Sequence, residues 1–209
     1  MKIYSRALAF ATVASILSMP AFAQSPDNQA TSEGHLAGAN EAMSMVPAKA
    51  ILSHTLVASN DRPDSTVEAR IRNKVTLSDG TVLPAGAMLI GKVSQDDTQV
   101  AGMAKLALRF DQVRTKDGKV VPIKATIVGL YTPGSGDSTT TIGPDNNMPN
   151  TWTHHVLVVD QLSVASGVDL HSKIASNNSG VFVSTTKRDI KLGAGSELQL
   201  AIGPARTAS

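Results

Sequence analysis

Apolar and polar residues alternate along most of the chain from Lys49 onward, and the alternation is clearest over residues 67–77. One face of that stretch holds Val67, Ala69, Ile71, Val75 and Leu77, and the other holds Glu68, Arg70, Arg72, Lys74 and Thr76. A period of two is typical of a β-strand with one buried face. Similar patterns predict strands over 51–57, 81–83, 88–93, 103–113, 119–129, 155–160, 180–186, 190–192 and 197–202.

Short turn motifs separate these strands. Asp-Gly pairs are strong hairpin-turn signals, and glycine adopts the positive φ that tight corners require. Residues 83–89 also resemble residues 192–198, which indicates either a shared corner geometry or a coincidence in a Gly/Ala-rich chain. We expect structural turn roles for Asp79, Gly80, Pro84, Gly86, Asp117, Gly118 and Gly195.

The spacing of strands and turns predicts an all-β fold, a small antiparallel β-barrel or sandwich. The predicted barrel domain covers residues 49–203, follows a flexible, disordered segment at 24–48 and precedes a tail at 204–209. A long, polar, Gly/Pro-rich insertion interrupts it at 131–150. Residues 161–179 are ambiguous, and a short helix is one option there.

Residues 1–23 have the parts of a secretory signal peptide. Lys2 and Arg6 form a basic start, residues 7–19 are mostly apolar, and Ala21-Phe22-Ala23 supplies the small residues that precede a cleavage site. We therefore expect an exported protein, periplasmic or extracellular, with a peripheral position at the outer membrane as one option. No membrane span is expected after cleavage, because a spanning helix needs about 20 apolar residues.

Charge and composition exclude several function classes. Loss of Lys2 and Arg6 with the signal reduces the 19 basic residues to 17, equal to the 17 acidic residues. A neutral mature chain argues against nucleic-acid binding. The chain has no cysteine, which excludes disulfides, thiol catalysis and thiolate metal sites.

A family resemblance follows from three stretches of sequence. Residues 75–93 read VTLSDGTVLPAGAMLIGKV, residues 106–111 read LALRFD, and residues 117–123 read DGKVVPI. Together they resemble the C-terminal β-barrel of TrbI-type proteins, envelope-spanning scaffold components of conjugation and type IV secretion systems. The resemblance covers about residues 49–130, with a weaker echo at 181–202. It implies a barrel fold and a structural role, since its motifs are turn and packing motifs.

Two features depart from the TrbI-type pattern. Those proteins keep an N-terminal membrane helix, whereas this chain begins with a cleavable signal. They also carry an apolar hairpin of helices that crosses the outer membrane, whereas the insertion at 131–150 is polar and cannot cross hydrocarbon. The resemblance therefore implies a soluble relative that consists of the barrel.

Candidate catalytic chemistry is confined to the region 136–160. Gly136-Asp137-Ser138 resembles a serine-hydrolase nucleophile motif, but a nucleophile elbow needs a preceding strand and a following helix. His154 and His155 follow Trp152, and adjacent strand residues point to opposite faces, so the two histidines are not expected to share a metal. A solvated loop and one inward and one outward histidine are the structural alternatives.

Metal and cofactor sites are not expected. Zinc needs three or four convergent protein ligands and calcium needs six to eight oxygens. The histidines are scattered, and Asp96, Asp97 and Asp145 do not form a spaced acidic loop.

A basic stripe of Arg70, Arg72 and Lys74 is the candidate interaction face. It indicates either a contact for phosphate or anionic glycan or an ordinary solvent face whose charges protect an edge strand.

Two function classes remain open. The first is a non-enzymatic cell-envelope module that binds an envelope protein. The second is a secreted hydrolase that uses Ser138, His154, His155 and Asp160.

Overall fold

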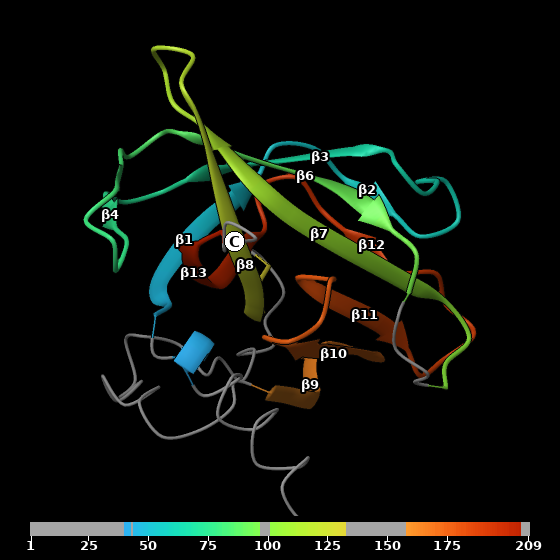
Figure 1. Cartoon of the computed structure of the whole chain (residues 1–209). Helices are drawn as coiled ribbons and strands as arrows, with labels where there is room; N and C mark the ends of the chain where they lie inside the picture. The colour runs from blue at the N-terminus through green and yellow to red at the C-terminus, as the bar shows by residue number, and fades with distance from the viewer. Residues whose placement is uncertain (1–39, 43, 97–100, 133–157, 206–209) are drawn as a thin grey trace, which may run out of the picture.

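The long elements of the protein are all strands (Figure 1). The computed structural model describes residues 40–42, 44–96, 101–132 and 158–205. The strands are β1 (Val46–Leu52), β2 (Leu56–Val57), β3 (Thr66–Ile71), β4 (Val75–Thr76), β5 (Val82–Leu83), β6 (Met88–Ser94), β7 (Lys105–Arg114), β8 (Val120–Tyr131), β9 (Val158–Ala165), β10 (Val168–Lys173), β11 (Gly180–Ser184), β12 (Lys191–Leu192) and β13 (Glu197–Pro204). The all-β prediction is confirmed.

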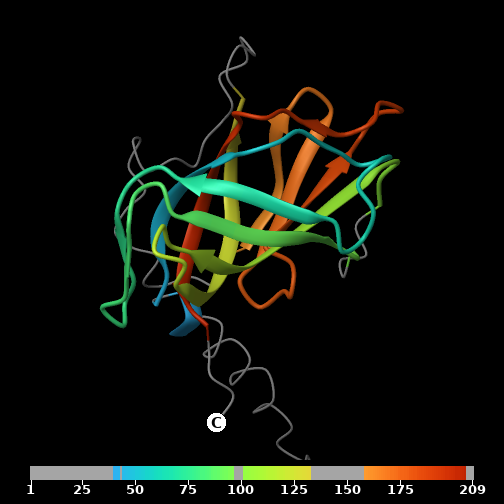
Figure 2. The same cartoon turned by 90° about the horizontal axis from the view of Figure 1, so that it is seen from above.

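Six of these strands close into an antiparallel barrel. Their order is β6-β3-β1-β13-β8-β7, and β6 pairs with β7 to complete the ring. The ribbon views from the side and from above show the strands wrapping around one interior (Figures 1 and 2). Closure satisfies the backbone of both strands that would otherwise be sheet edges.

Strand β7 is the point at which the sheet branches. Its C-terminal part, Gln112–Arg114, pairs with β8, whereas its N-terminal part, Lys105–Leu108, pairs with β11. β11 is followed in the sheet by β10 and then β9. Strands β7 and β8 therefore separate, and the three-stranded unit β9–β11 continues the sheet from the gap.

The barrel interior holds the alternating apolar residues of its strands. Fully buried members include Ala50, Val67, Ala69, Ile71, Leu89, Leu108, Ile127, Leu198 and Ile202. The same core continues into the branch through Leu170 and Phe182. The pleat places every second residue inward, as the sequence pattern predicts.

Two corners of the barrel have the same geometry, in the two stretches that resemble each other in sequence. In each, a glycine with φ near +80° follows the short strand, and the long barrel strand starts two residues after the glycine. The amide of the glycine donates to the carbonyl of the last residue of another barrel strand. The amide of that last residue donates in return to the carbonyl of the residue after the glycine. The bonds are Gly86 N to Ile71 O (2.8 Å), Ile71 N to Ala87 O (2.9 Å), Gly195 N to Leu52 O (2.9 Å) and Leu52 N to Ser196 O (2.9 Å).

Replacement of Gly86 by valine is expected to lower the free energy of unfolding by about 2 kcal/mol, because a β-branched residue is strained at positive φ. The φ of Gly86 is +80°, and the nearest atom to an added Cβ is the flexible Lys116 Cε at 3.2 Å. The loss should therefore come from backbone strain. Urea unfolding measures it, and Gly195→Val should cost a similar amount. An unchanged midpoint in both variants would contradict the corner geometry.

The corners also correct two predicted strands. The single strand over 67–77 is wrong: β3 ends at Ile71, and β4 pairs with β5 in a separate two-stranded sheet. The strand over 51–57 is wrong in the same way, since β1 runs from Val46 to Leu52 and β2 pairs with β12. Ile71 is the last residue of β3, and Leu52 is the last residue of β1. Both use their amide and carbonyl in hydrogen bonds to a corner, and the chain after each of them enters a two-stranded sheet.

The β7–β8 hairpin closes through the second Asp-Gly turn. Gly118 has φ +84°, and its amide donates to Thr115 O at 3.0 Å. The side chain of Thr115 and the backbone amide of Asp117 hydrogen-bond the Asp117 carboxyl and lower its pKa below the ordinary value. The first Asp-Gly turn matches it, with Gly80 at φ +84°.

The helix option for residues 161–179 is wrong. Strands β9 and β10 form a hairpin through these residues, with a turn at Gly167, whose φ is +74°. The predicted N-terminal boundary is also late, because β1 begins at Val46. Residues 1–39, 133–157 and 206–209, which include the predicted signal peptide and most of the predicted insertion, lie outside the described residues. Within the described part, no helix has the length and apolar character needed to span a membrane.

Candidate functional site

The three residues of the predicted basic stripe differ in their contacts within the described structure. Arg70, Arg72 and Lys74 are all exposed. Arg72 forms an ion pair with Glu197, whose side chain is 9% exposed, and Lys49 Nζ lies 3.7 Å from the same carboxylate. Arg72 therefore neutralises a buried carboxylate on β13, whereas Arg70 and Lys74 face solvent.

Replacement of Arg72 by alanine is expected to lower the free energy of unfolding by about 1–2 kcal/mol, since it leaves the buried Glu197 carboxylate with Lys49 alone. Arg70→Ala, the control on the same stripe, should change stability by less than about 0.5 kcal/mol. Urea unfolding at neutral pH measures both. Equal effects would show that the Glu197 contact does not stabilise the barrel.

The predicted catalytic residues are not brought together by the described structure. Ser138, His154 and His155 lie outside the described residues, and Asp160 lies on β9 with its side chain undescribed. The hydrolase alternative therefore stays a prediction. Asp96 pairs with Lys105 at 2.6 Å, and the described residues contain no cluster of three or more metal-ligating side chains.

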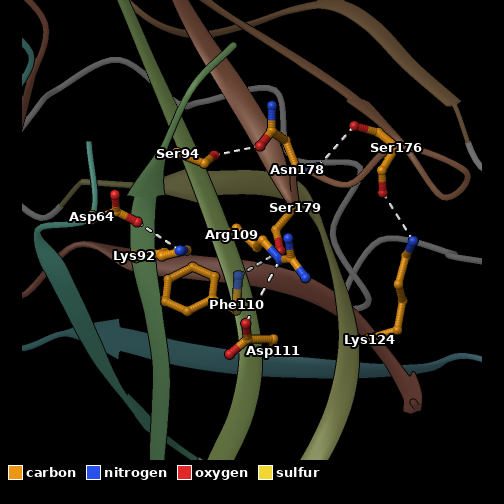
Figure 3. Close-up of polar contacts among 10 residues, drawn as sticks. All are labelled: Asp64, Lys92, Ser94, Arg109, Phe110, Asp111, Lys124, Ser176, Asn178 and Ser179. Carbon is orange, nitrogen blue, oxygen red and sulfur yellow. Dashed lines mark hydrogen bonds and ion pairs between the residues drawn. The ribbon is translucent and has the colours of Figure 1, made fainter. Parts of the chain in front are cut away.

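A different site forms where β7 and β8 separate. The loop between β10 and β11, residues 174–179, fills the gap and ties the neighbouring strands (Figure 3). Ser179 bridges β7 and β8: its amide donates to Leu108 O, and its carbonyl accepts from the Ile127 amide, both at 2.7 Å. Its hydroxyl accepts from the Phe110 amide at 2.9 Å. The buried backbone groups freed by the separation are thereby satisfied.

The same loop reaches one more barrel strand, β6, and contacts β8 a second time. Asn178 contacts β6 through the Ser94 hydroxyl, and its side-chain amide donates to Gln95 O at 3.0 Å. Ser176 O accepts from Lys124 Nζ on β8 at 2.9 Å. Three adjacent barrel strands are therefore held by one short loop, which fixes the outward side chains around it.

Arg109 of β7 lines two hollows, and the smaller of them is also lined by Asn177 and Asn178 of this loop. The larger, of about 750 Å³, is bounded by Glu41, Ser44, Met45, Arg109, Asp111, Gln112, Pro122, Ile123, Lys124, Gly203, Pro204 and Ala205. The smaller, of about 310 Å³, is bounded by Pro63, Asp64, Lys92, Val93, Ser94, Gln95, Arg109, Asn177 and Asn178. We call the two together the Arg109 groove.

Two cationic side chains of the groove come from residues that lie directly opposite each other on adjacent strands. Lys92 on β6 is the cross-strand partner of Arg109 on β7, and like charges opposite each other destabilise a sheet. Lys92 is neutralised by Asp64 at 2.6 Å. Arg109 has a weaker partner, since its Nε lies 3.7 Å from Asp111 Oδ2, which is too long for a hydrogen bond.

The sequence predicts a strand over 103–113 that contains Arg109, but it indicates no site at this residue. The alternation around it is the same as in any half-buried strand. The groove depends on Lys92, Lys124 and Asn178, which come from three other segments. No local signal joins these residues.

Comparison with known proteins gives no family. No protein-family model matches the sequence, and no curated protein matches it. The TrbI-type resemblance therefore stays an expectation, and the geometry of the Arg109 groove is the basis for a functional proposal.

Proposed function

We propose that the protein is a non-enzymatic, exported cell-envelope module that binds another protein through the Arg109 groove. The groove is the observation that carries the proposal. The signal-peptide pattern of residues 1–23 supports export, and the TrbI-type resemblance supports a scaffold role for the barrel.

The size and lining of the groove suit a segment of a partner protein. Its larger hollow falls within the range of about 300–1,000 Å³ that is typical of ligand sites. Apolar surface from Pro122, Pro204 and Ala205 lies beside the charged groups of Arg109 and Lys124. Such a mixture provides both contact area and specificity.

The framework around the groove is preorganised. Strand β7 is paired on both sides, by β6 and by β8 or β11, and the loop at 174–179 is tied to β6, β7 and β8. A rigid site loses less conformational entropy on binding than a mobile one. The groove therefore favours recognition over a purely structural role.

The edge of strand β9 is a weaker candidate for the same task. In the described part of the chain, β9 pairs with β10 alone, so it offers an edge for β-augmentation. However, Gln161 has φ +56°, and the pairing with β10 shifts register near it. Bulges of this kind interrupt an edge and discourage addition of a strand.

Site-specific photo-cross-linking tests the proposal. A photoreactive amino acid replaces Gln112, which lines the groove, in tagged full-length protein expressed in its native cells. The control is the same substitution at Val82, which is 47% exposed and lies outside the groove. We expect one protein to be linked repeatedly from the groove position, in the envelope fraction, and not from the control.

Two outcomes would contradict the proposal. Equal cross-linking from both positions would show nonspecific contact. No cross-linked protein from the groove, in a fraction where the tagged chain is abundant, would show that the groove does not bind a protein partner.

A further inference from the structure

We infer that the Arg109 groove recognises a carboxylate on a linear peptide segment, with Arg109 as the main contact and Lys124 beside it. This inference rests on the proposed protein-binding function and adds the chemistry of the segment that is bound. The carboxylate is either an Asp or Glu side chain or a C-terminus, which present the same chemistry to a guanidinium.

Arg109 has donors that the described structure does not use. Its side chain is 44% exposed, and its one ion pair or side-chain hydrogen bond among the described residues is the 3.7 Å approach of Nε to Asp111. The two terminal nitrogens are therefore available to a ligand. A guanidinium presents a planar fork of N–H donors that matches a carboxylate in two parallel hydrogen bonds.

Neighbouring groups hold a second cation and leave room for one anion. Lys124 Nζ donates to Ser176 O at 2.9 Å, which keeps the ammonium on the wall of the larger hollow (Figure 3). Lys92, opposite Arg109, is paired with Asp64 at 2.6 Å, so the nearest carboxylate left for Arg109 is Asp111 at 3.7 Å. A bound carboxylate would give Arg109 the hydrogen-bonded anionic partner that Asp111 does not supply at this distance.

The overall charge of the lining distinguishes a single carboxylate from a polyanion. Lys92, Arg109 and Lys124 are matched in number by Glu41, Asp64 and Asp111. A nucleic acid or a highly charged polysaccharide would meet these carboxylates along its length and be repelled. A single carboxylate at the terminal nitrogens of Arg109 meets fewer of them, since Asp111 approaches Arg109 at Nε.

The chemistry beside Arg109 favours a peptide as the carrier of that carboxylate. Pro122, Pro204 and Ala205 offer an apolar wall for a neighbouring side chain, and Gln112 offers an amide for the peptide backbone. The described residues that line the two hollows include no aromatic side chain. A sugar ligand would lack the stacking surface that such ligands commonly use.

Binding to a randomised, fluorescein-labelled peptide library tests the inference, followed by anisotropy titration of selected peptides against the full-length protein. The library is made with free and with amidated C-termini, and selected Asp or Glu positions are replaced by Asn or Gln. We expect selected peptides to lose about tenfold or more in affinity when their carboxylate is removed, as for loss of a charged hydrogen-bonded contact. The two library forms separate a side-chain from a C-terminal carboxylate.

Variants of the protein supply the matched controls. Arg109→Gln should lose about tenfold or more in affinity, and Arg109→Lys should fall between it and the original chain, since lysine keeps the charge without the fork. Arg114→Gln is the control, because Arg114 lies on the same strand, is 50% exposed and pairs with Glu68 outside the groove. The thermal midpoints of Arg109→Gln and the original chain should be similar. The variant loses the 3.7 Å approach to Asp111, and it also loses the unfavourable like-charge pairing with Lys92, so the two effects offset each other.

The outcomes separate this inference from the proposed function. If peptides bind but neither their carboxylates nor Arg109 matter, the groove binds protein and the carboxylate inference is overturned. If no peptide binds while cross-linking from Gln112 succeeds, the partner is bound as a folded surface, and the inference is again overturned. If sulfated polysaccharide, added as a competitor, binds more tightly than any peptide, the ligand class is wrong.

Discussion

Replacement of Gly91 by alanine is expected to destabilise the barrel by about 3 kcal/mol. Gly91 lies on β6 at a shift of register, paired with Phe110 of β7. An added Cβ would lie 2.2 Å from Arg109 O and 2.6 Å from Phe110 Cδ1, so the two strands would have to move apart. Overpacking of a well-packed interior typically costs about 1–3 kcal/mol, and a clash with backbone places this variant at the upper end.

The backbone of β7 has little freedom to relieve that clash. Ser179 holds Leu108 O and the Phe110 amide, on either side of Arg109. Movement of the strand would therefore break bonds at the branch as well. The variant should affect the groove and the barrel together.

Urea unfolding measures the effect of Gly91→Ala, with Gly193→Ala as the matched control. An added Cβ at Gly193 meets its nearest atom, Ser196 Oγ, at 3.9 Å. That variant should be neutral or slightly stabilising, because alanine lowers the entropy of the unfolded chain. A midpoint for Gly91→Ala close to that of the control would mean that β6 and β7 do not approach as closely as described.

Replacement of Phe182 by alanine is expected to lower the free energy of unfolding by about 4 kcal/mol. Phe182 is fully buried on β11. It is the cross-strand partner of Leu106 on β7 and of Leu170 on β10, which itself pairs with Leu162 on β9. This apolar row joins the β9–β11 unit to the barrel core. Truncation of a buried phenylalanine typically costs about 3–5 kcal/mol, because a cavity remains.

Val181→Ala is the comparison for that prediction. Val181 is also buried, but it belongs to a small outer cluster with Ala107 and Val183. Loss of two methyl groups there should cost about 1.5 kcal/mol. Equilibrium unfolding in urea measures both variants. Similar losses would show that β11 does not share the main core, and separate unfolding transitions would show that β9–β11 folds independently of the barrel.

Gly91 and Phe182 also support the strands and the loop that surround the groove. The groove forms because β8 leaves β7 and the β10–β11 loop enters the gap. Phe182 anchors the unit that carries the loop, and Gly91 allows β6 to approach the strand that carries Arg109. Recognition of a ligand by preorganised donors depends on such supporting contacts.

The Arg109 groove could not be predicted from the sequence, because its residues are brought together by strand pairing. Arg70, Arg72 and Lys74 form a visible stripe because they lie close together in sequence, yet Arg72 serves to neutralise Glu197. Arg109 and Lys92 are 17 positions apart and become direct neighbours through strand pairing. Local pattern identifies charges on one strand but carries no information on which strand lies beside it.

The sequence by itself determined the strands, their buried faces and the turns. Alternation placed Val67, Ala69 and Ile71 on one face, and all three are fully buried, because the side-chain period of a strand is a local property. The repeated corner motif likewise produced the same geometry at Gly86 and Gly195. Only the tertiary structure decided the order of the strands, closure of β6 on β7, the ends of β1 and β3, and the branch at Ser179. These features depend on hydrogen bonds between segments far apart in the chain, which a local pattern does not specify.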